Sequence, residues 1–418
     1  MKILISAYAC EPQAGSEPGV GWNWAKQLSA MGHDVWVLTR QNNQNNIESA
    51  LHQFSEDSQI HFEYVDLPPF LRAWKKGRQL IHLYYFVWQM LAFFKAKALH
   101  RQVTFDTVHH VTFVSARMPS LMGLLGIPFI LGPIAGGEHA PWVLRKSYPF
   151  AGWIADFARD LSNFWVRFDP WMHLTFATAQ RIYVTSSQTY DLVPRQYQSK
   201  CSIQLAIGYE GDYIEKPPIQ GDEQDIKLLF VGQLRYLKGV HFALYAFLAL
   251  LQTCPNARFT IVGSGPEEMW LKNIASELSL DHQIDWVPWV ERTALNEIYE
   301  RHDVLVFPSL HDSGGMVVLE AMAQGLPVVC LDLGGPGIIV DETSGRVIQT
   351  QGISEEQVIQ YLEDAFCELA KNNKIRQQLC RGAVQRVQAF TWRHLVEKIY
   401  GQSQLAASDT MQKEALSP

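Results

Sequence analysis

A strand, a glycine loop and a helix follow one another in the carboxyl-terminal half of the chain, and this unit constrains the fold more than any other stretch. Residues 303–308 (Asp-Val-Leu-Val-Phe-Pro) predict a short buried strand. Residues 316–324 predict a helix, which Gly325 and Pro327 end. A strand that passes through a glycine loop into a helix is typical of an α/β sheet.

Two glycines and two acids surround the start of this helix. Gly314 and Gly315 allow a ligand to approach the backbone, and the free N–H groups and positive dipole end suit an anion such as phosphate. Seven residues separate Asp312 from Glu320, which places them on the order of 10 Å apart at ~1.5 Å rise per residue. A nucleotide sugar, with hydroxyls on both sides of a diphosphate, would satisfy these features. The alternative is a buried strand and an amphipathic helix with two incidental acids.

The stretch from His311 to Val329 resembles the acid-x7-acid motif of retaining glycosyltransferases with the GT-B fold, and within them glycosyltransferase family 4 (glycosyl transferases group 1). The resemblance implies that Asp312 contacts the donor sugar and that Glu320 holds the ribose hydroxyls. It also implies that the diphosphate lies on the backbone amides of Gly314, Gly315, Met316 and Val317. The family usually has Glu at the first position, so Asp312 is one methylene shorter than expected.

Length and composition limit the class of protein. A chain of 418 residues is long enough for two domains, and 47% hydrophobic with 18% charged residues is ordinary for a globular protein. A formal net charge of −7 argues against a general nucleic-acid binder. The six cysteines show no C-x-x-C spacing, so we expect neither a zinc site nor a disulfide framework. No signal peptide and no apolar run of about 18 residues is found, so we expect a cytoplasmic protein.

Strand, loop and helix units recur in both halves of the chain, which predicts two Rossmann-like, doubly wound α/β domains facing across a cleft. The resemblance implies an acceptor-binding domain at 1–206 and a nucleotide-sugar donor-binding domain at 207–390. It also implies that a last helix at 391–403 packs back on the first domain. We expect residues 404–418 to form a disordered tail.

The amino half offers candidate residues at the ends of predicted strands. Gly15 and Ser16 lie in a glycine loop after the first strand, where parallel sheets bind ligands. A plain turn is the alternative, and the resemblance places this loop beside the donor phosphate and the acceptor. His110 and then His109 are the candidate active-site histidines, although the family usually has His-x-His and this chain has adjacent histidines. Glu138, after a double glycine, is a candidate for sugar or acceptor contact or an ordinary loop acid.

The carboxyl half adds candidates for the diphosphate and the base. Lys238 lies in a glycine loop between a strand and a helix, which suits a phosphate ligand, and it matches the lysine of the family pattern G-R-L-x-x-x-K-G. Gln233 stands where that pattern has arginine, so either the second cationic contact to the diphosphate is absent or Arg235 supplies it by another route. The resemblance also makes Gly263 and Val290 contacts of the nucleotide base, although both residues could belong to plain turns.

An aromatic run from Leu80 to Phe94 is flanked by cations on both sides. Two interpretations stand: a buried helix with solvated basic ends, or peripheral membrane contact through residues 70–101 at the inner face of the cytoplasmic membrane. Residues 149–171, also aromatic, predict helices that border the acceptor site.

The resemblance implies a retaining, metal-independent transferase of the hexosyltransferase type. It would move a sugar from a nucleotide diphosphate sugar to a carbohydrate or lipid acceptor in polysaccharide or glycolipid synthesis. No D-x-D metal motif is present, so we expect neither a metal nor another cofactor. The alternatives are a sugar-nucleotide hydrolase or epimerase of the same fold, and a non-catalytic scaffold that binds sugar nucleotides or a membrane surface. The glycine spacings do not match the G-x-G-x-x-G of a dehydrogenase.

Overall fold

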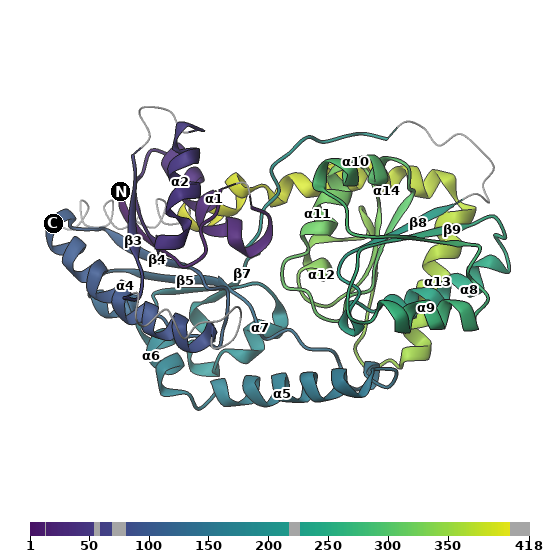
Figure 1. The fold of residues 1–418 in the computed structure, drawn as a ribbon, viewed down its shortest axis with the longest axis horizontal. Coiled ribbons are helices and arrows are strands. Elements are labelled where there is room, and N and C mark those ends of the chain that lie inside the picture. The colour runs from purple at the N-terminus through teal and green to yellow at the C-terminus, as the bar shows by residue number, and fades with distance from the viewer. Residues whose placement is uncertain (13, 54–58, 69–80, 217–225, 402–418) are drawn as a thin grey trace, which may run out of the picture. The chain divides into compact units, whose positions relative to one another are not determined.

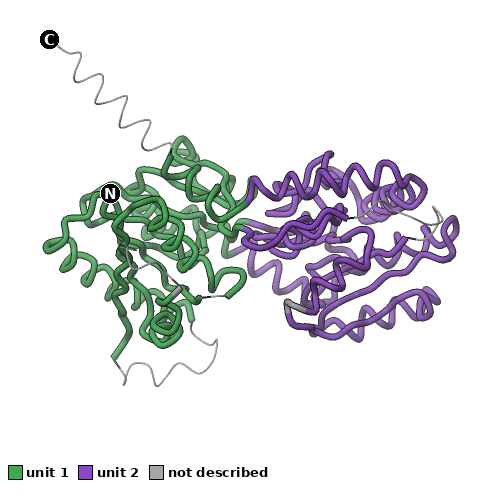
Figure 2. The backbone as a smooth tube through the Cα atoms, turned by 90° about the horizontal axis from the view of Figure 1, so that it is seen from above, with its two compact units in different colours: residues 1–137, 162–208, 391–418 green, residues 138–161, 209–390 purple. Residues whose placement is uncertain are grey.

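Two parallel sheets frame the protein in the computed structural model, which describes all residues except 13, 54–58, 69–80, 217–225 and 402–418. Each sheet belongs to its own unit (Figure 2). The first unit comprises residues 1–137, 162–208 and 391–418, and the second comprises residues 138–161 and 209–390. The predicted class, an α/β chain with two doubly wound domains, is confirmed by these two sheets.

The first unit has a seven-stranded parallel sheet in the order β3-β2-β1-β4-β5-β6-β7. Its strands are β1 (Lys2–Ala7), β2 (Asp34–Arg40), β3 (Ile60–Val65), β4 (Thr107–Thr112), β5 (Phe129–Ile134), β6 (Arg181–Val184) and β7 (Cys201–Ile203). Its helices are α1 (Ser16–Ala30), α2 (Gln44–Ala50), α4 (Ile81–Val103), α6 (Pro170–Thr178) and α7 (Ser187–Leu192), with a further helix at 392–401. Every residue of β4 and β5 is buried, because helices cover both faces of the sheet (Figure 1).

The second unit has a six-stranded parallel sheet in the order β10-β9-β8-β11-β12-β13. Its strands are β8 (Lys227–Val231), β9 (Arg258–Val262), β10 (Ile284–Val287), β11 (Val304–Phe307), β12 (Val328–Leu331) and β13 (Gly345–Ile348). Its helices are α8 (Val240–Leu251), α9 (Glu268–Glu277), α10 (Arg292–Glu300), α11 (Met316–Ala323), α12 (Pro336–Ile339), α13 (Glu355–Lys371) and α14 (Asn373–Val387). The predicted strand, glycine loop and helix at 303–325 are thus β11, its loop and α11.

The chain passes between the units at residues 137/138, 161/162, 208/209 and 390/391. Beside the last two, Tyr209 N donates to Phe390 O at 2.8 Å within the second unit. The helix at 392–401 belongs to the first unit, where Gln204 Nε2 donates to Leu395 O. The structure departs from the predicted division at 206 by assigning residues 138–161 to the second unit. The predicted tail at 404–418 lies outside the described residues.

The helices expected over residues 149–171 are α5 (Phe150–Val166) and the start of α6, and their place beside an acceptor stays a prediction. Helix α5 starts in the part of the chain that belongs to the second unit and ends in the part that belongs to the first. Its acids, Asp156 and Asp160, point inward and are held by arginines, whereas its large apolar side chains are mostly exposed.

Helix α4 confirms the core interpretation of the aromatic run for one side of the helix, and the membrane contact stays a prediction. One side of the helix is core, since Tyr85, Trp88 and Ala92 are fully buried. The other side exposes Leu83 and other large apolar residues. Residues 70–80 of the predicted membrane contact lie outside the described residues.

Candidate functional site

The order of strands in the second unit marks one place for a ligand. From β8 the chain moves outward through β9 to β10, and it then returns to the other side of β8 with β11. The loops that follow β8 and β11 therefore leave the sheet in opposite directions, which opens a crevice at the carboxyl ends of these strands. Lys238 lies in the first of these loops and Asp312 in the second.

Backbone contacts hold the two loops together. Leu310 N donates to Leu237 O at 2.9 Å, one residue before Lys238. Gly239, the next residue, has a left-handed φ of 67°, and a Cβ on it would lie 2.0 Å from Pro308 O. Only glycine fits this close approach. Gly239 therefore allows the backbone beside Lys238 to approach the β11 loop closely.

Lys238 and Asp312 form an ion pair at the meeting point of the loops. Lys238 Nζ lies 2.5 Å from Asp312 Oδ2, and the side chains are 15% and 19% exposed. Burial by itself raises the pKa of Asp312, but the charge and hydrogen bond of Lys238 and the amides of Gly315 and Gly314 lower it below its usual value. Asp312 is therefore ionised at neutral pH, and Lys238 is shielded from bulk water by its partner and by the Phe307 ring, 5.1 Å away.

Asp312 also holds the loop that leads into helix α11. Its Oδ1 accepts hydrogen bonds from Gly314 N at 3.0 Å and Gly315 N at 2.8 Å. Its own carbonyl accepts from Gly335 N at 2.8 Å. Two of the four amides predicted to hold a diphosphate are thus occupied by Asp312 in this structure, while Met316 and Val317 begin the helix proper.

The remaining donor-site candidates lie at the same edge of the sheet. Gly263 follows β9 and Val290 follows β10, and because neighbouring parallel strands end together, both lie on the Lys238 side of the crevice. Gln233 and Arg235 are exposed in the β8 loop. Glu320 is half-buried in α11.

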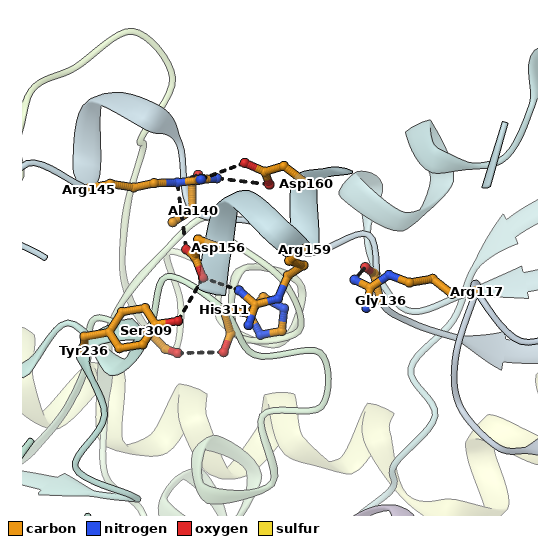
Figure 3. A network of polar contacts seen from close by, with 10 residues as sticks. All are labelled: Arg117, Gly136, Ala140, Arg145, Asp156, Arg159, Asp160, Tyr236, Ser309 and His311. Carbon is orange, nitrogen blue, oxygen red and sulfur yellow. Dashed lines mark hydrogen bonds and ion pairs between the residues drawn. The ribbon is translucent and has the colours of Figure 1, made fainter. Parts of the chain in front are cut away.

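A buried network that the sequence did not indicate supports the Lys238 loop (Figure 3). Tyr236 OH donates to Asp156 Oδ1 at 3.0 Å, two residues before Lys238. Asp156 is also bonded to Arg159 and lies 3.8 Å from Arg145 Nε. The sequence signal for this network was the run of acids and arginines on a helix that is otherwise apolar.

Arg145 anchors the network to α5. Its guanidinium is fully buried and holds Asp160 with two hydrogen bonds of 2.6 and 3.2 Å, while Nε donates to Ala140 O at 2.8 Å. These charge-assisted bonds hold residues 138–161 together, and the bond from Tyr236 to Asp156 joins this segment to the β8 loop.

His311, the neighbour of Asp312, faces this network. Burial and the charge of Arg159 lower its pKa to about 4, and Glu138 and Asp312 only partly oppose the shift. Within the described part of the chain its buried Nε2 has no hydrogen-bond partner. Glu138, predicted as a sugar or acceptor contact, is itself buried in the second unit.

The first unit has a corresponding crevice between β1 and β4, where its strand order reverses. The β1 loop carries Gly15 and Ser16, both exposed at the start of α1, and Ser16 has a left-handed φ of 59° that serine rarely adopts. Glu17 ties this loop to the one after β4 by accepting from Val114 N at 2.9 Å.

His109 and His110 in β4 are 0% and 1% exposed, and both ring nitrogens of each have partners. His109 Nε2 donates to Gly132 O at 2.6 Å and Nδ1 accepts from Tyr400 OH at 2.9 Å. His110 lies 3.1 Å from Tyr85 OH and 3.2 Å from Ser6 Oγ. Burial lowers the pKa of His109 to about 4 and that of His110 to about 3. Both rings are therefore neutral and hold the first unit together, and their catalytic role stays a prediction.

Among the described residues, no group of three or more His, Cys, Asp and Glu side chains could hold a metal ion.

Comparison with known proteins agrees with this geometry. Residues 213–383, which include both loops of the crevice, match the family model described as Glycosyl transferases group 1. A D-inositol 3-phosphate glycosyltransferase of Saccharomonospora viridis is 30% identical over 225 residues, which are 51% of this chain and 48% of that protein. The chain thus spans about half the length of this relative.

Similarity to solved structures extends over nearly the whole chain. Sucrose-phosphate synthase from Thermosynechococcus elongatus has a TM-score of 0.63 at 18% identity, with 97% of this chain and 99% of that chain covered. The pneumococcal O-GlcNAc transferase GtfA, in complex with UDP and GlcNAc, has a TM-score of 0.58 at 12% identity, with 96% and 98% covered. At these identities the likeness concerns the fold. Residues 213–383 thus match the family model of the glycosyl transferases group 1, in a chain that has the fold of the GT-B glycosyltransferases.

Proposed function

We propose that this protein is a retaining glycosyltransferase that moves a sugar from a nucleotide diphosphate sugar to the hydroxyl of a carbohydrate or lipid acceptor. The observation that carries the proposal is the ion pair of Lys238 and Asp312 at the reversal point of the second sheet, beside the start of α11. It places a shielded cation and the positive end of a helix where parallel sheets bind ligands.

Donor binding uses charge that the free protein already holds in place. The diphosphate lies against Lys238 and the amides of Met316 and Val317, so Lys238 is shared between the ligand and Asp312. The bonds from Gly314 and Gly315 to Asp312 are the ones that change when Asp312 turns to the sugar. Glu320, one turn further into α11, takes the ribose hydroxyls.

The rate increase comes from the leaving group. The diphosphate gains negative charge as the bond to the sugar breaks, and fixed positive groups that already point at it stabilise that state more than the bound donor. Lys238 is such a group, because its loop is held by Leu310 and by the Tyr236–Asp156 bond. Ordinary lysines at a surface would lose this advantage to solvent.

The proposed reaction needs no divalent cation, because Lys238 and the end of α11 provide the positive charge. We expect transfer to continue unchanged in EDTA. Loss of transfer in EDTA and its return with Mg²⁺ or Mn²⁺ would contradict this part of the proposal.

A screen of nucleotide sugars tests the donor. We expect one of the UDP-, GDP- or ADP-sugars to raise the melting temperature, since a ligand at 100 times its Kd stabilises the folded state by about 2.7 kcal/mol. UDP-sugars come first, because the fold neighbour GtfA was solved with UDP and GlcNAc. No shift with any nucleotide sugar, while the protein is folded, would speak for a scaffold without donor binding.

Turnover of the donor, measured with and without an acceptor, then distinguishes sugar transfer from sugar-nucleotide hydrolysis. We expect nucleotide diphosphate release to depend on a carbohydrate or lipid acceptor, and the anomeric proton signal of the product to show retention. Release at the same rate without acceptor would instead assign a sugar-nucleotide hydrolase.

A further inference from the structure

One face of the first unit is covered by large apolar side chains that no part of the described chain packs over. We call it the aromatic face, and it comprises Leu83, Met90 and Phe94 of α4, Phe164 and Trp165 of α5, and Phe168 and Trp171 at the start of α6. Phe94, Trp165 and Phe168 are 62%, 61% and 61% exposed. Single exposed apolar residues are normal on a surface, but a group of seven is not.

The spacing shows that α4 contributes a continuous stripe. Leu83, Met90 and Phe94 are seven and four residues apart, which places them along one side of the helix. The opposite side, with Tyr85 and Trp88, is buried in the core. A surface helix of a globular protein is usually polar on its outer side. The outer side of α4 is apolar instead, and the first unit does not bury it.

Ring contacts connect this stripe with the rest of the face. Phe86 of α4 meets Trp171 edge to face, with ring centroids 5.8 Å apart. Phe168 lies 5.3 Å from Phe164 and 6.4 Å from Trp165 by the same measure. Figure 1 shows α4 and α6 next to each other in the first unit. The aromatic face is therefore one surface built from three helices.

The charges around the face are mostly positive. Residues 81–103 contain no acid, and residues 161–181 contain only Asp169. The Asp169 carboxylate caps α6 by accepting from Trp171 N at 2.8 Å and Met172 N at 3.4 Å. The cations Lys97, Arg101 and Arg167 are exposed. Lys97 and Arg101 follow Phe94 along the exposed side of α4, at spacings of three and seven residues.

We propose that the aromatic face docks on the surface of an anionic lipid bilayer. Tryptophan and phenylalanine side chains are favourable at the boundary between headgroups and acyl chains, and the cations find anionic headgroups beside them. In the part of the chain that the structure describes, no helix is long and apolar enough to span a membrane. The proposed docking is a contact of the aromatic face with the bilayer surface.

This inference does not depend on the proposed function. If both hold, the protein works at a membrane, and its acceptor is a hydroxyl of a lipid-linked compound rather than of a soluble one.

Co-sedimentation with vesicles tests the docking. We expect the full chain to bind vesicles of phosphatidylcholine and phosphatidylglycerol, and to bind pure phosphatidylcholine more weakly. Phe168→Glu should weaken binding by about tenfold or more, because it removes an aromatic side chain that the bilayer would bury and adds an anion at the boundary. Met269→Glu is the matched control, since Met269 is equally exposed on α9 in the second unit, and it should bind as the natural protein does.

The charge component has its own variant. Lys97→Gln should weaken binding to the anionic vesicles by about fivefold, and added salt should reduce this difference. Arg301→Gln, which removes an exposed cation of the second unit, should have no effect.

Equal binding by Phe168→Glu and the natural protein would overturn the proposal. So would a face that pairs with a second copy of this chain: the natural protein would then be a dimer by light scattering, Phe168→Glu a monomer, and neither would bind vesicles. The melting temperature and the circular dichroism spectrum of each variant, measured without donor, show whether the variant is folded, so that weaker vesicle binding is not mistaken for unfolding.

Discussion

The crevice of the second unit and that of the first have the same topology and opposite electrostatics. Both lie where the strand order reverses, β8 beside β11 in one and β1 beside β4 in the other. In the second unit the loops present an ionised pair, Lys238 and Asp312, with 15% and 19% of each side chain exposed. In the first unit the two histidines of strand β4, His109 and His110, are buried and neutral.

The difference teaches what each crevice is built to do. A cation near the surface of a crevice can exchange its partner carboxylate for an anionic ligand, because it stays paired and equally solvated in both states. A neutral ring whose two nitrogens are already bonded contributes rigidity instead. We propose that the exposed loop at Gly15 and Ser16 supplies ligand contacts of the first unit.

Removing the charge of the second crevice should have the largest effect. We expect Lys238→Met to reduce transfer by about 100-fold or more with the fold intact, since one preorganised group at a developing negative charge has this magnitude. Initial rates at saturating donor measure it. Lys374→Met, an exposed lysine of α14, is the control and should keep full activity. Full activity of Lys238→Met would end the assignment of the crevice as the donor site.

Loosening the loop without touching the charge sharpens the comparison. Tyr236→Phe removes the hydrogen bond to Asp156 but keeps the ring, so Lys238 retains its charge and loses part of its support. We expect transfer to fall by about tenfold, in line with about 1.5–3 kcal/mol for a hydrogen bond to a charged group. A structural loss alone would lower the melting temperature without changing the KM for the donor, whereas we expect that KM to rise.

The neutral histidines predict how acid acts on stability. Folding lowers the pKa of each ring, so the unfolded chain takes up a proton at a higher pH than the folded protein does. The stability that each ring supports is therefore present above pH 6.5. It is lost as the pH falls toward about 4 for His109 and about 3 for His110. Each such ring steepens the loss by about 1.4 kcal/mol per pH unit. Urea unfolding between pH 7 and pH 5 measures the slope.

The variant His109→Gln keeps a donor and an acceptor for Gly132 and Tyr400 and does not titrate. We expect its unfolding free energy to depend on pH less steeply than that of the natural protein. Parallel slopes would show that His109 is not neutral in the folded state.

The smallest effect concerns the strained serine of the first crevice. Ser16→Gly should stabilise the protein by about 0.5–1 kcal/mol, because glycine adopts a left-handed φ without the cost to a side chain. If the loop serves the reaction, transfer should fall although stability rises. Unchanged transfer would make Ser16 a plain turn residue.

Much of the fold could be read from hydrophobic periods and glycine positions. The element at 303–325 was predicted almost to the residue, because an all-apolar strand followed by two glycines has few other folds. The pairing of Lys238 with Asp312 could not be read, since 74 residues separate them and only the return of the chain to β11 joins their loops. The Tyr236–Asp156 bond is similar, because Asp156 comes from a segment that the sequence assigns to the other domain.

The aromatic run was predicted as either core or membrane contact. Its helix has a buried side and an exposed side, so one interpretation cannot describe both. Tyr85 and Trp88 are core, whereas Leu83 and Phe94 are exposed, and composition alone does not distinguish them. Only the packing of α4 against the sheet decides which side remains outside.

The sequence by itself determined which residue types are present at each strand end, and with them the α/β class and the acid-x7-acid motif. The tertiary structure alone decided their ionisation and their partners. It buried two histidines so that they are neutral, and it brought Lys238 to Asp312, which lowers the pKa of that carboxyl. The physical reason is that the free energy of a charge depends on solvent and on neighbouring groups, which are fixed by contacts between residues far apart in the chain.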